Sequence, residues 1–297
     1  MLRFTNWKAR WLMVKVLNPG LYSTVQDMGR FGYQEYGVPY SGVMDRYAAK
    51  IVNALLSNDE NAAVIEMTMK GATLQFECDA FICISGALMN PKLNDLPVKN
   101  NKIIAVKSGD ILSFGKLELG FRCYLGVSGG FNTEMVMQSK SMFANITSSH
   151  ILRKGDMLHI ERVAIKNSSK HASVRINKSY LNTQTIEAFM GPEFYLLSEE
   201  QQNQLLTSQF TISKENNRMA YQLEETIEND IEPIITSPVI PGTVQLTPSG
   251  KLIVLMRDCQ TTGGYPRILQ LKESAIDVLS QKFTGKELCF DLEEQIF

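Results

Sequence analysis

The densest group of residues that could do chemistry is DCQTTGGYPR, residues 258–267, which follows the apolar run LIVLM after a single residue, Arg257. Its polar groups include a carboxylate, a primary amide, two hydroxyls and a phenol, all able to bind a small polar ligand. The paired glycines permit positive φ and a close approach of the backbone to a ligand. The same pattern also fits a hairpin turn between two strands. The candidate residues here are Asp258, Gln260, Thr261, Thr262, Gly263, Gly264 and Tyr265.

A second candidate region is the stretch PGLYSTVQDMGRFGYQEYGVPYSGVMDR, residues 19–46. It is rich in glycine and in charged residues. Long loops of this kind in compact domains tend to expose backbone N–H groups and to line sites. A solvated surface loop is the alternative. The candidates within it are Gln26, Asp27, Arg30 and Asp45, and the spacing of Asp27 and Arg30 would allow them to pair.

Two further residues have side chains that could bind an anion or react. Arg218, beside the alternating strand pattern of residues 219–223, is either a surface arginine or a clamp for a carboxylate or phosphate. Cys259 has no histidine near it in the sequence, so we predict a buried, unreactive thiol.

The segment GVSGG, residues 126–130, matches the G-x-S-x-G pattern of serine hydrolases, and Asp156 and His171 follow Ser128 in the matching order. That motif requires a strand, a sharp turn and then a helix. The residues after it do not resemble a helix, so we expect a glycine hinge at the end of a strand.

The elements that must position these residues are mostly short strands, rich in β-branched and aromatic residues and separated by turn residues. Three amphipathic helices are expected, at 44–58 with Ser41 as a cap, at 197–206 beginning at Ser198, and at 272–283 ended by Gly285. The expected strands lie at 13–17, 63–67, 72–76, 81–85, 102–106, 110–114, 121–127, 157–161, 173–176, 185–189, 243–246, 252–256, 267–271 and 287–290. We therefore predict a mainly β fold of barrels or sandwiches.

Composition narrows the class of protein. The formal net charge is -1, which does not favour nucleic acid or an anionic membrane as a partner. No apolar run approaches the ~20 residues of a membrane helix. The five cysteines lack CxxC spacing, so we expect no structural metal site, and their odd number fits a reducing cytoplasm.

The chain is expected to form two domains. The polar stretch around 165–180 is the best boundary. We predict a disordered extension over residues 1–12, with Met13 as the alternative start, followed by an N-terminal domain at 13–170 and a C-terminal domain at 171–297.

Two long motifs carry a family resemblance, PGLYSTVQDMGRFGYQEYGVPYSGVMD and GKLIVLMRDCQTTGGYPRI. Together with YLGVSGGF, NRMAYQL and SGAL, they make the chain similar to the KipA-like family, also called allophanate hydrolase subunit 2 or the biotin-dependent carboxyltransferase family. The resemblance runs from about residue 13 to residue 290 and is greatest to the C subunit of 5-oxoprolinase. It implies two cyclophilin-like β-barrel domains with a few short helices.

The same resemblance implies a function. Such a chain would act with two partners, a KipI-like protein (the B subunit) and a LamB-like protein (the A subunit), using ATP to open 5-oxoproline to glutamate. In related enzymes the module transfers a carboxyl group from carboxybiotin, on a separate carrier protein, to a urea- or amide-type substrate. A third possibility is a non-catalytic regulator that binds a KipI-like kinase inhibitor. The chain departs from the family pattern at residues 138–158, where Lys140 replaces the usual arginine.

These implications give each candidate a role. We expect Asp258, with Asp45 or Asp27 as further candidates, to handle or orient a proton. The amide or lactam would be held by Gln260, Thr261, Thr262, Gly263, Gly264 and Tyr265, with Gln26 nearby, while Arg218 and Arg30 would balance negative charge. On this basis Arg218→Ala is expected to abolish turnover and leave the fold intact.

Overall fold

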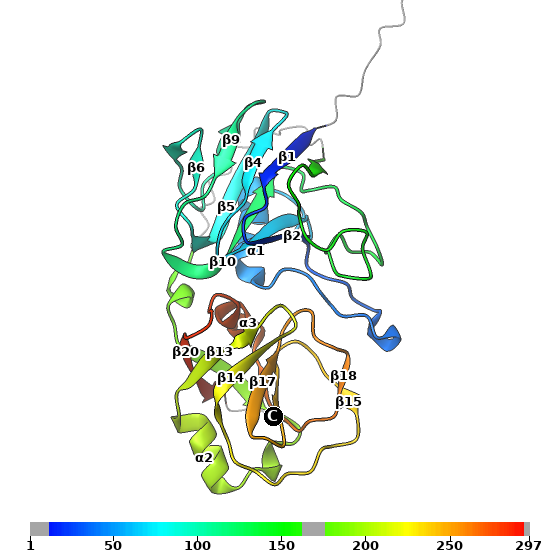
Figure 1. Ribbon diagram of the computed structural model, residues 1–297, viewed down its shortest axis with the longest axis vertical. Helices are drawn as coiled ribbons and strands as arrows, with labels where there is room; N and C mark the ends of the chain where they lie inside the picture. The colour runs from blue at the N-terminus through cyan, green and yellow to red at the C-terminus, as the bar shows by residue number, and fades with distance from the viewer. Residues whose placement is uncertain (1–11, 162–175, 294–297) are drawn as a thin grey trace, which may run out of the picture.

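The computed structural model describes residues 12–161 and 176–293, which we call the N-terminal and C-terminal halves. The two halves lie one above the other along the long axis of the molecule (Figure 1). The predicted domain boundary at 170/171 lies outside the described residues, as does residue range 1–11 of the predicted extension. We keep two domains as a proposal, because β11 is paired in the N-terminal half and β12 in the C-terminal half.

The N-terminal half consists of two antiparallel sheets that share one hydrophobic core. Alternate residues of each strand face this core, as in Val14 and Val16 on one sheet and Ile65 and Met67 on the other. The first sheet has the order β11 (Met157–His159), β1 (Met13–Asn18), β4 (Thr73–Phe76), β9 (Ile111–Ser113), β6 (Lys92–Leu93) and β7 (Leu96–Pro97). The second has the order β2 (Tyr22–Gln26), β3 (Val64–Thr68), β10 (Leu119–Val127), β5 (Ala80–Leu88) and β8 (Ile104–Val106).

Helix α1 (Arg46–Leu56) packs its apolar face on the second sheet. The predicted helix is confirmed, but its cap is Asp45 and not Ser41, because the Asp45 carboxylate accepts a hydrogen bond from the N–H of Ala48 at 2.8 Å. Ser41 lies upstream of the helix, in the left-handed region with φ 55°.

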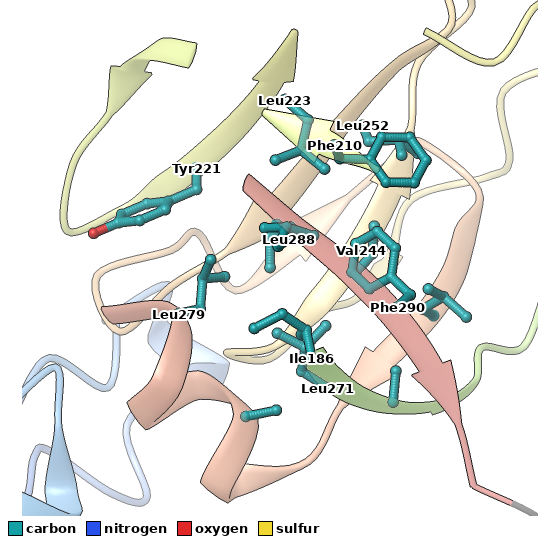
Figure 2. Packing of buried hydrophobic residues seen from close by; sticks show 14 of the residues in the cluster. Ile186, Phe210, Tyr221, Leu223, Val244, Leu252, Leu271, Leu279, Leu288 and Phe290 are labelled. Atoms are coloured by element: carbon teal, nitrogen blue, oxygen red, sulfur yellow. The ribbon is translucent and has the colours of Figure 1, made fainter. Parts of the chain in front are cut away.

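The C-terminal half is a closed barrel, in which β12 and β20 pair in parallel and the other neighbours are antiparallel. Figure 2 shows Leu223, Val244 and Leu288 converging inside it. Met44, from the N-terminal half, belongs to the same buried cluster. The barrel order is β12 (Thr185–Met190), β19 (Arg267–Leu271), β16 (Thr243–Leu246), β17 (Lys251–Leu255), β14 (Ala220–Thr226), β13 (Phe210–Asn216) and β20 (Glu287–Leu292).

Two helices flank the barrel. Helix α2 (Glu199–Thr207) begins after Ser198, as its sequence predicts, and Ser198 forms a capping box with Gln201. Helix α3 (Glu273–Ser280) ends earlier than predicted, because its last turn tightens into bonds from Gln281 N to Val278 O and from Lys282 N to Leu279 O. Short elements complete the half: β15 (Ser237–Pro238), β18 (Thr262–Gly263) and the 3₁₀ turns Ser179–Leu181 and Phe194–Leu196, with a third such turn at Gln34–Tyr36 in the N-terminal half.

The prediction of a mainly β chain is confirmed. The strand predicted at 173–176 lies outside the described residues except for Ile176, which is in no strand. Strand β13 was not predicted, because its second half is polar and strongly charged. Residues 129–161 contain no helix after Ser128, so the serine-hydrolase arrangement is absent from this fully described segment, and His171 lies outside the described residues. No helix among the described residues is long and apolar enough to cross a membrane.

Candidate active site between the two halves

A cavity of about 500 Å³ lies at the junction of the two halves, within the size range of small-molecule sites. Both halves supply its walls, and apolar atoms make up most of the exposed lining surface although most of the lining residues carry a polar group. The lining residues are Tyr22, Pro39, Thr68, Phe121, Arg122, Phe143, Asn216, Asn217, Arg218, Met219, Asp258 and Gln260.

Arg218 and Asp258 form the polar centre of this wall. Arg218 lies in the turn between β13 and β14, and Asp258 in the turn after β17, and a backbone bond from Asp258 N to Arg218 O at 2.9 Å holds the two turns together. The Arg218 guanidinium donates to both carboxylate oxygens of Asp258, from Nε at 2.8 Å and from Nη2 at 3.1 Å. This two-point contact fixes the orientation of the carboxylate.

Glu66, from strand β3 of the N-terminal half, is the residue that the sequence reasoning missed. Its Oε1 accepts from Arg218 Nη1 at 2.5 Å, and its Oε2 accepts from the Met44 N–H at 2.7 Å and from the Tyr124 hydroxyl at 2.8 Å. Arg218 therefore lies between two carboxylates from opposite halves. The signal available in the sequence was an acid inside the apolar strand AVIEM, because a charged group buried there requires a partner.

Arg122, on strand β10, extends the network across the junction. Its Nη1 donates to the Tyr221 hydroxyl at 2.6 Å and to the carbonyl of Ser280 at 2.5 Å, and its Nε lies 3.8 Å from Glu66 Oε1. In Figure 2 the Tyr221 hydroxyl points out of the barrel core. Two guanidiniums and two carboxylates thus balance each other in a buried cluster, which we call the junction network: Glu66, Arg122, Arg218 and Asp258.

Burial and neighbouring charges shift the pKa values of Asp258 and Arg218 in opposite directions. Burial raises the pKa of Asp258, while the charge of Arg218 lowers it, and the net direction is upward. For Arg218, burial lowers the pKa, but the charges of Asp258 and Glu66 outweigh it and hold the pKa above its ordinary value. Burial likewise raises the pKa of Tyr22 on the opposite wall. The site can therefore offer a fixed, partly desolvated carboxylate beside the Gln260 amide to a ligand N–H and C=O.

The residues of segment 258–267 lie in two different places, some in the cavity lining and others in a strand pair beside it. Asp258 and Gln260 line the cavity, as does Arg218. Residues 262–263 instead form strand β18, which pairs with β15 and is not part of the cavity lining. Neither Gly263 nor Gly264 adopts the positive φ that a glycine pair permits. A Cβ at Gly263 would lie 2.6 Å from Gln245 Nε2, so a larger residue there would require the Gln245 amide to shift. Contact of Thr261, Thr262, Gly264 and Tyr265 with substrate stays a prediction.

Asp27, Arg30 and Gln26 form a second group, which anchors residues 136–142 to the loop after β2. The Asp27 carboxylate accepts from the hydroxyls of Ser139 and Ser141, both at 2.7 Å, and from the Lys140 N–H at 2.6 Å. Arg30 donates to the carbonyls of residues 136 and 141 and does not pair with Asp27, and Gln26 donates to the carbonyl of residue 142. These three residues are buried and lie outside the cavity lining. Their predicted roles in catalysis and substrate binding stay predictions.

Asp45 is buried at the junction, but it also lies outside the cavity lining. Besides capping α1, its carboxylate accepts from the Tyr180 hydroxyl at 2.8 Å and from Gln281 Nε2 at 2.6 Å. Burial raises its pKa to about 6, although its hydrogen bonds oppose the shift. Asp45 thus joins the halves by hydrogen bonds, and a catalytic role for it stays a prediction.

The described residues contain no group of three or more His, Cys, Asp or Glu side chains arranged to hold a metal ion. Cys259 is buried, as its sequence context predicts, and burial raises the pKa of its thiol to about 12.

Comparison with known proteins defines the class. The family model described as carboxyltransferase domain, subdomain A and B, matches residues 36–292. The chain therefore belongs to the carboxyltransferase-domain family, and the resemblance predicted from its motifs is confirmed.

Its relatives include components and domains of enzymes. The chain is 33% identical to the C subunit of 5-oxoprolinase from Escherichia coli, a match covering 96% of this chain and 93% of that protein. It is 32% identical to the protein of the same name from Haemophilus influenzae, over 94% of this chain and 91% of the relative. The crystal structure of the K. lactis urea amidolyase superposes with a TM-score of 0.86 at 27% identity, covering 96% of this chain but 19% of that one.

Proposed function

We propose that this chain is a subunit of an ATP-dependent 5-oxoprolinase-type complex that opens 5-oxoproline to glutamate. It would act there with two partners, a KipI-like B subunit together with a LamB-like A subunit. Support comes from its near full-length similarity to two proteins that are each named as the C subunit of 5-oxoprolinase. Its free cysteines accord with the cytoplasmic location that we propose for the complex.

The observation that carries the proposal is the cavity wall formed by Asp258 and Gln260. A lactam presents one N–H donor and one C=O acceptor side by side. The Asp258 carboxylate can accept from the N–H, and the Gln260 amide can donate to the carbonyl. Phe121, Phe143 and Met219 provide an apolar surface for the ring carbons.

Arg218 takes a different role from the one that its sequence suggested. Its guanidinium already contacts Glu66, Asp258 and the carbonyl of Gly42, so four of its five N–H donors are used. We assign it the orientation of Asp258 and not the binding of a substrate anion. Removing it would also leave two buried carboxylates without their partner, so we no longer expect Arg218→Ala to leave the fold intact.

A second candidate function is carboxyl transfer from carboxybiotin to an amide- or urea-type substrate. The family is described by its carboxyltransferase domain, and 52% of the chain is 39% identical to the Lachancea kluyveri urea amidolyase. The ureido group of biotin pairs N–H and C=O as a lactam does, so Asp258 and Gln260 fit either group. Bound carboxybiotin would supply the carboxyl group.

The test is reconstitution of the purified chain with its KipI-like and LamB-like partners. We expect ATP-dependent release of glutamate from 5-oxoproline, reduced at least 100-fold by Asp258→Asn, an effect typical of removing a group that acts on the reacting centre. Asp291→Asn, at an exposed acid on β20, is the matched control and retains full turnover.

Three other results would contradict this assignment. Wild-type turnover in the Asp258→Asn complex would remove Asp258 from the site. Carboxylation of urea or an amide with a biotinylated carrier protein, without glutamate release, would favour the second function. Tight binding of the KipI-like partner with no turnover of any lactam or urea would identify a regulator.

A further inference from the structure

A second concave surface lies in the N-terminal half, away from the junction cavity and sharing no lining residue with it. It has a volume of about 720 Å³ and is built by the chain around β6, β7 and the start of β10, on the side of the upper half where β6 is labelled in Figure 1. Five lysines line it, namely Lys92, Lys99, Lys102, Lys116 and Lys178. We call it the lysine groove.

The charge of the groove is unusual for this chain. Glu118 is the one acid among its lining residues, and its carboxylate accepts a hydrogen bond from Asn90 Nδ2 at 2.8 Å. The whole chain has a formal net charge of -1, so the rest of it is net acidic while the groove is strongly basic. Like charges gathered in one concavity raise the local potential and attract anions.

The five amines also lack partners among the described residues. None of them forms an ion pair with a described carboxylate. Lysines elsewhere do so, as Lys50 does with Glu60 at 2.7 Å. Lys178 comes from the C-terminal half, so segments distant in the sequence bring unpaired positive charge to one place. Their mutual repulsion would be relieved by a bound anion.

The floor of the groove is apolar and held by backbone bonds. Pro91 is buried, Leu88 and Val98 are half-buried, and Val98 N donates to the carbonyl of Pro91 at 3.0 Å. A concave, apolar floor with a charged rim suits a small molecule that has both an apolar part and several negative charges. The rim contains lysines and no arginine. The arginine fork suits carboxylate and phosphate alike, whereas lysine binds phosphate as a point charge, so this rim would hold phosphates by charge and not by two-point geometry.

We propose that the lysine groove binds a small molecule carrying two or more phosphate groups, with the phosphates at the lysine rim and an apolar portion on the floor. The site is independent of the function assigned to the junction cavity. Either a nucleoside polyphosphate or another polyphosphorylated metabolite has this chemistry.

The test is calorimetric titration of the full chain with inorganic tripolyphosphate, ATP and adenosine at low salt. We expect one-to-one binding of tripolyphosphate, weakened at least ten-fold by Lys92→Gln/Lys102→Gln and weakened by added salt, because these charges are exposed to solvent. The control is Lys70→Gln/Lys214→Gln, at two exposed lysines outside the groove, which leaves the affinity unchanged.

Comparison of the ligands identifies the source of the affinity. Tighter binding of ATP than of tripolyphosphate supports a contribution from the apolar floor, whereas equal binding of the two would overturn that part of the proposal and leave recognition of phosphate alone. The proposal is overturned if neither ligand binds saturably, if both double variants weaken binding equally, or if adenosine binds as tightly as ATP. It is also overturned if hexaglutamate binds as tightly as tripolyphosphate, since the groove would then fit an acidic protein segment.

Discussion

Replacing Arg218 by methionine tests the junction network most directly. Arg218 contacts Glu66 at 2.5 Å and Asp258 at 2.8 Å, and all three side chains are largely buried. At an effective dielectric constant of about 20, two unit charges about 2.8 Å apart attract by roughly 6 kcal/mol. The penalty for burying the charges offsets much of this attraction. Removing one member of a buried pair typically destabilises a protein by about 3–5 kcal/mol, because the other charge stays buried without its partner.

We therefore expect Arg218→Met to lower the free energy of unfolding by about 3–5 kcal/mol at pH 8, measured by urea denaturation followed by circular dichroism. The matched control is Lys214→Met. The Lys214 side chain is 83% exposed and lies 3.8 Å from Glu215, so the loss there is about 0–1 kcal/mol.

The pH dependence gives the sharper criterion. Without Arg218, the buried carboxylate of Asp258 loses the charge that lowers its pKa, so its pKa, already raised by burial, rises further in the folded state. A raised pKa means that the native state binds more protons than the unfolded state, and the stability of the variant then falls as pH rises. The deficit relative to wild type is thus smaller at pH 5 than at pH 8, and Asp258→Asn in the variant recovers part of it. A deficit below about 1 kcal/mol, or one that grows toward acid pH, would refute the network as described.

Three further predictions concern other parts of the fold. Burial raises the pKa of Asp45 to about 6, so its contribution to stability falls as pH rises from about 4 through 6. This lowers the free energy of unfolding by up to roughly 3 kcal/mol between pH 4 and pH 7. Asp45→Asn should remove the dependence, as measured by urea denaturation. Gly191→Ala places a Cβ 2.1 Å from the Arg267 carbonyl oxygen and lowers the unfolding free energy by about 1–3 kcal/mol. Gly264→Ala is the control and changes it little, because its Cβ would be 3.5 Å from the nearest atom. Equal melting temperatures of the two variants would contradict this packing. Cys289 is the partly exposed thiol while the other four are buried, so a thiol reagent should label one cysteine rapidly in the native protein, and rapid labelling of two or more would show that the described burial is wrong.

The sequence predicted the elements better than it predicted the site. Strand and helix patterns located β17, α1 and α2, because burial of one face imposes a periodicity that the sequence displays. Of the candidate residues, Asp258, Gln260 and Arg218 line one cavity, since the loop after β17 and the turn before β14 lie at the same end of these paired strands. That much follows from local patterns.

The remaining contacts depend on tertiary structure. Glu66 and Arg218 are 152 residues apart, and no local pattern indicates that strand β3 meets the turn between β13 and β14 across the two halves. The carboxylate of Asp27 was a further candidate for handling a proton, but serines over 110 residues away use its hydrogen-bonding capacity. Residues of the same type thus differ in role because the fold places different hydrogen-bonding and charged partners next to them. The spacing of residues in the sequence does not show which partners those are.

The Met44 side chain couples the stability of the two halves. It precedes α1 in the N-terminal half, yet its side chain is fully buried in the core cluster of the barrel, and its N–H donates to Glu66. A C-terminal half made without the N-terminal half would therefore lack one side chain of this buried cluster, and large-to-small changes at such positions cost about 2–5 kcal/mol. Part of the buried core of the C-terminal half thus comes from the N-terminal half, so the two halves form one unit of stability. A hinge motion that separates them would have to withdraw the Met44 side chain from that core.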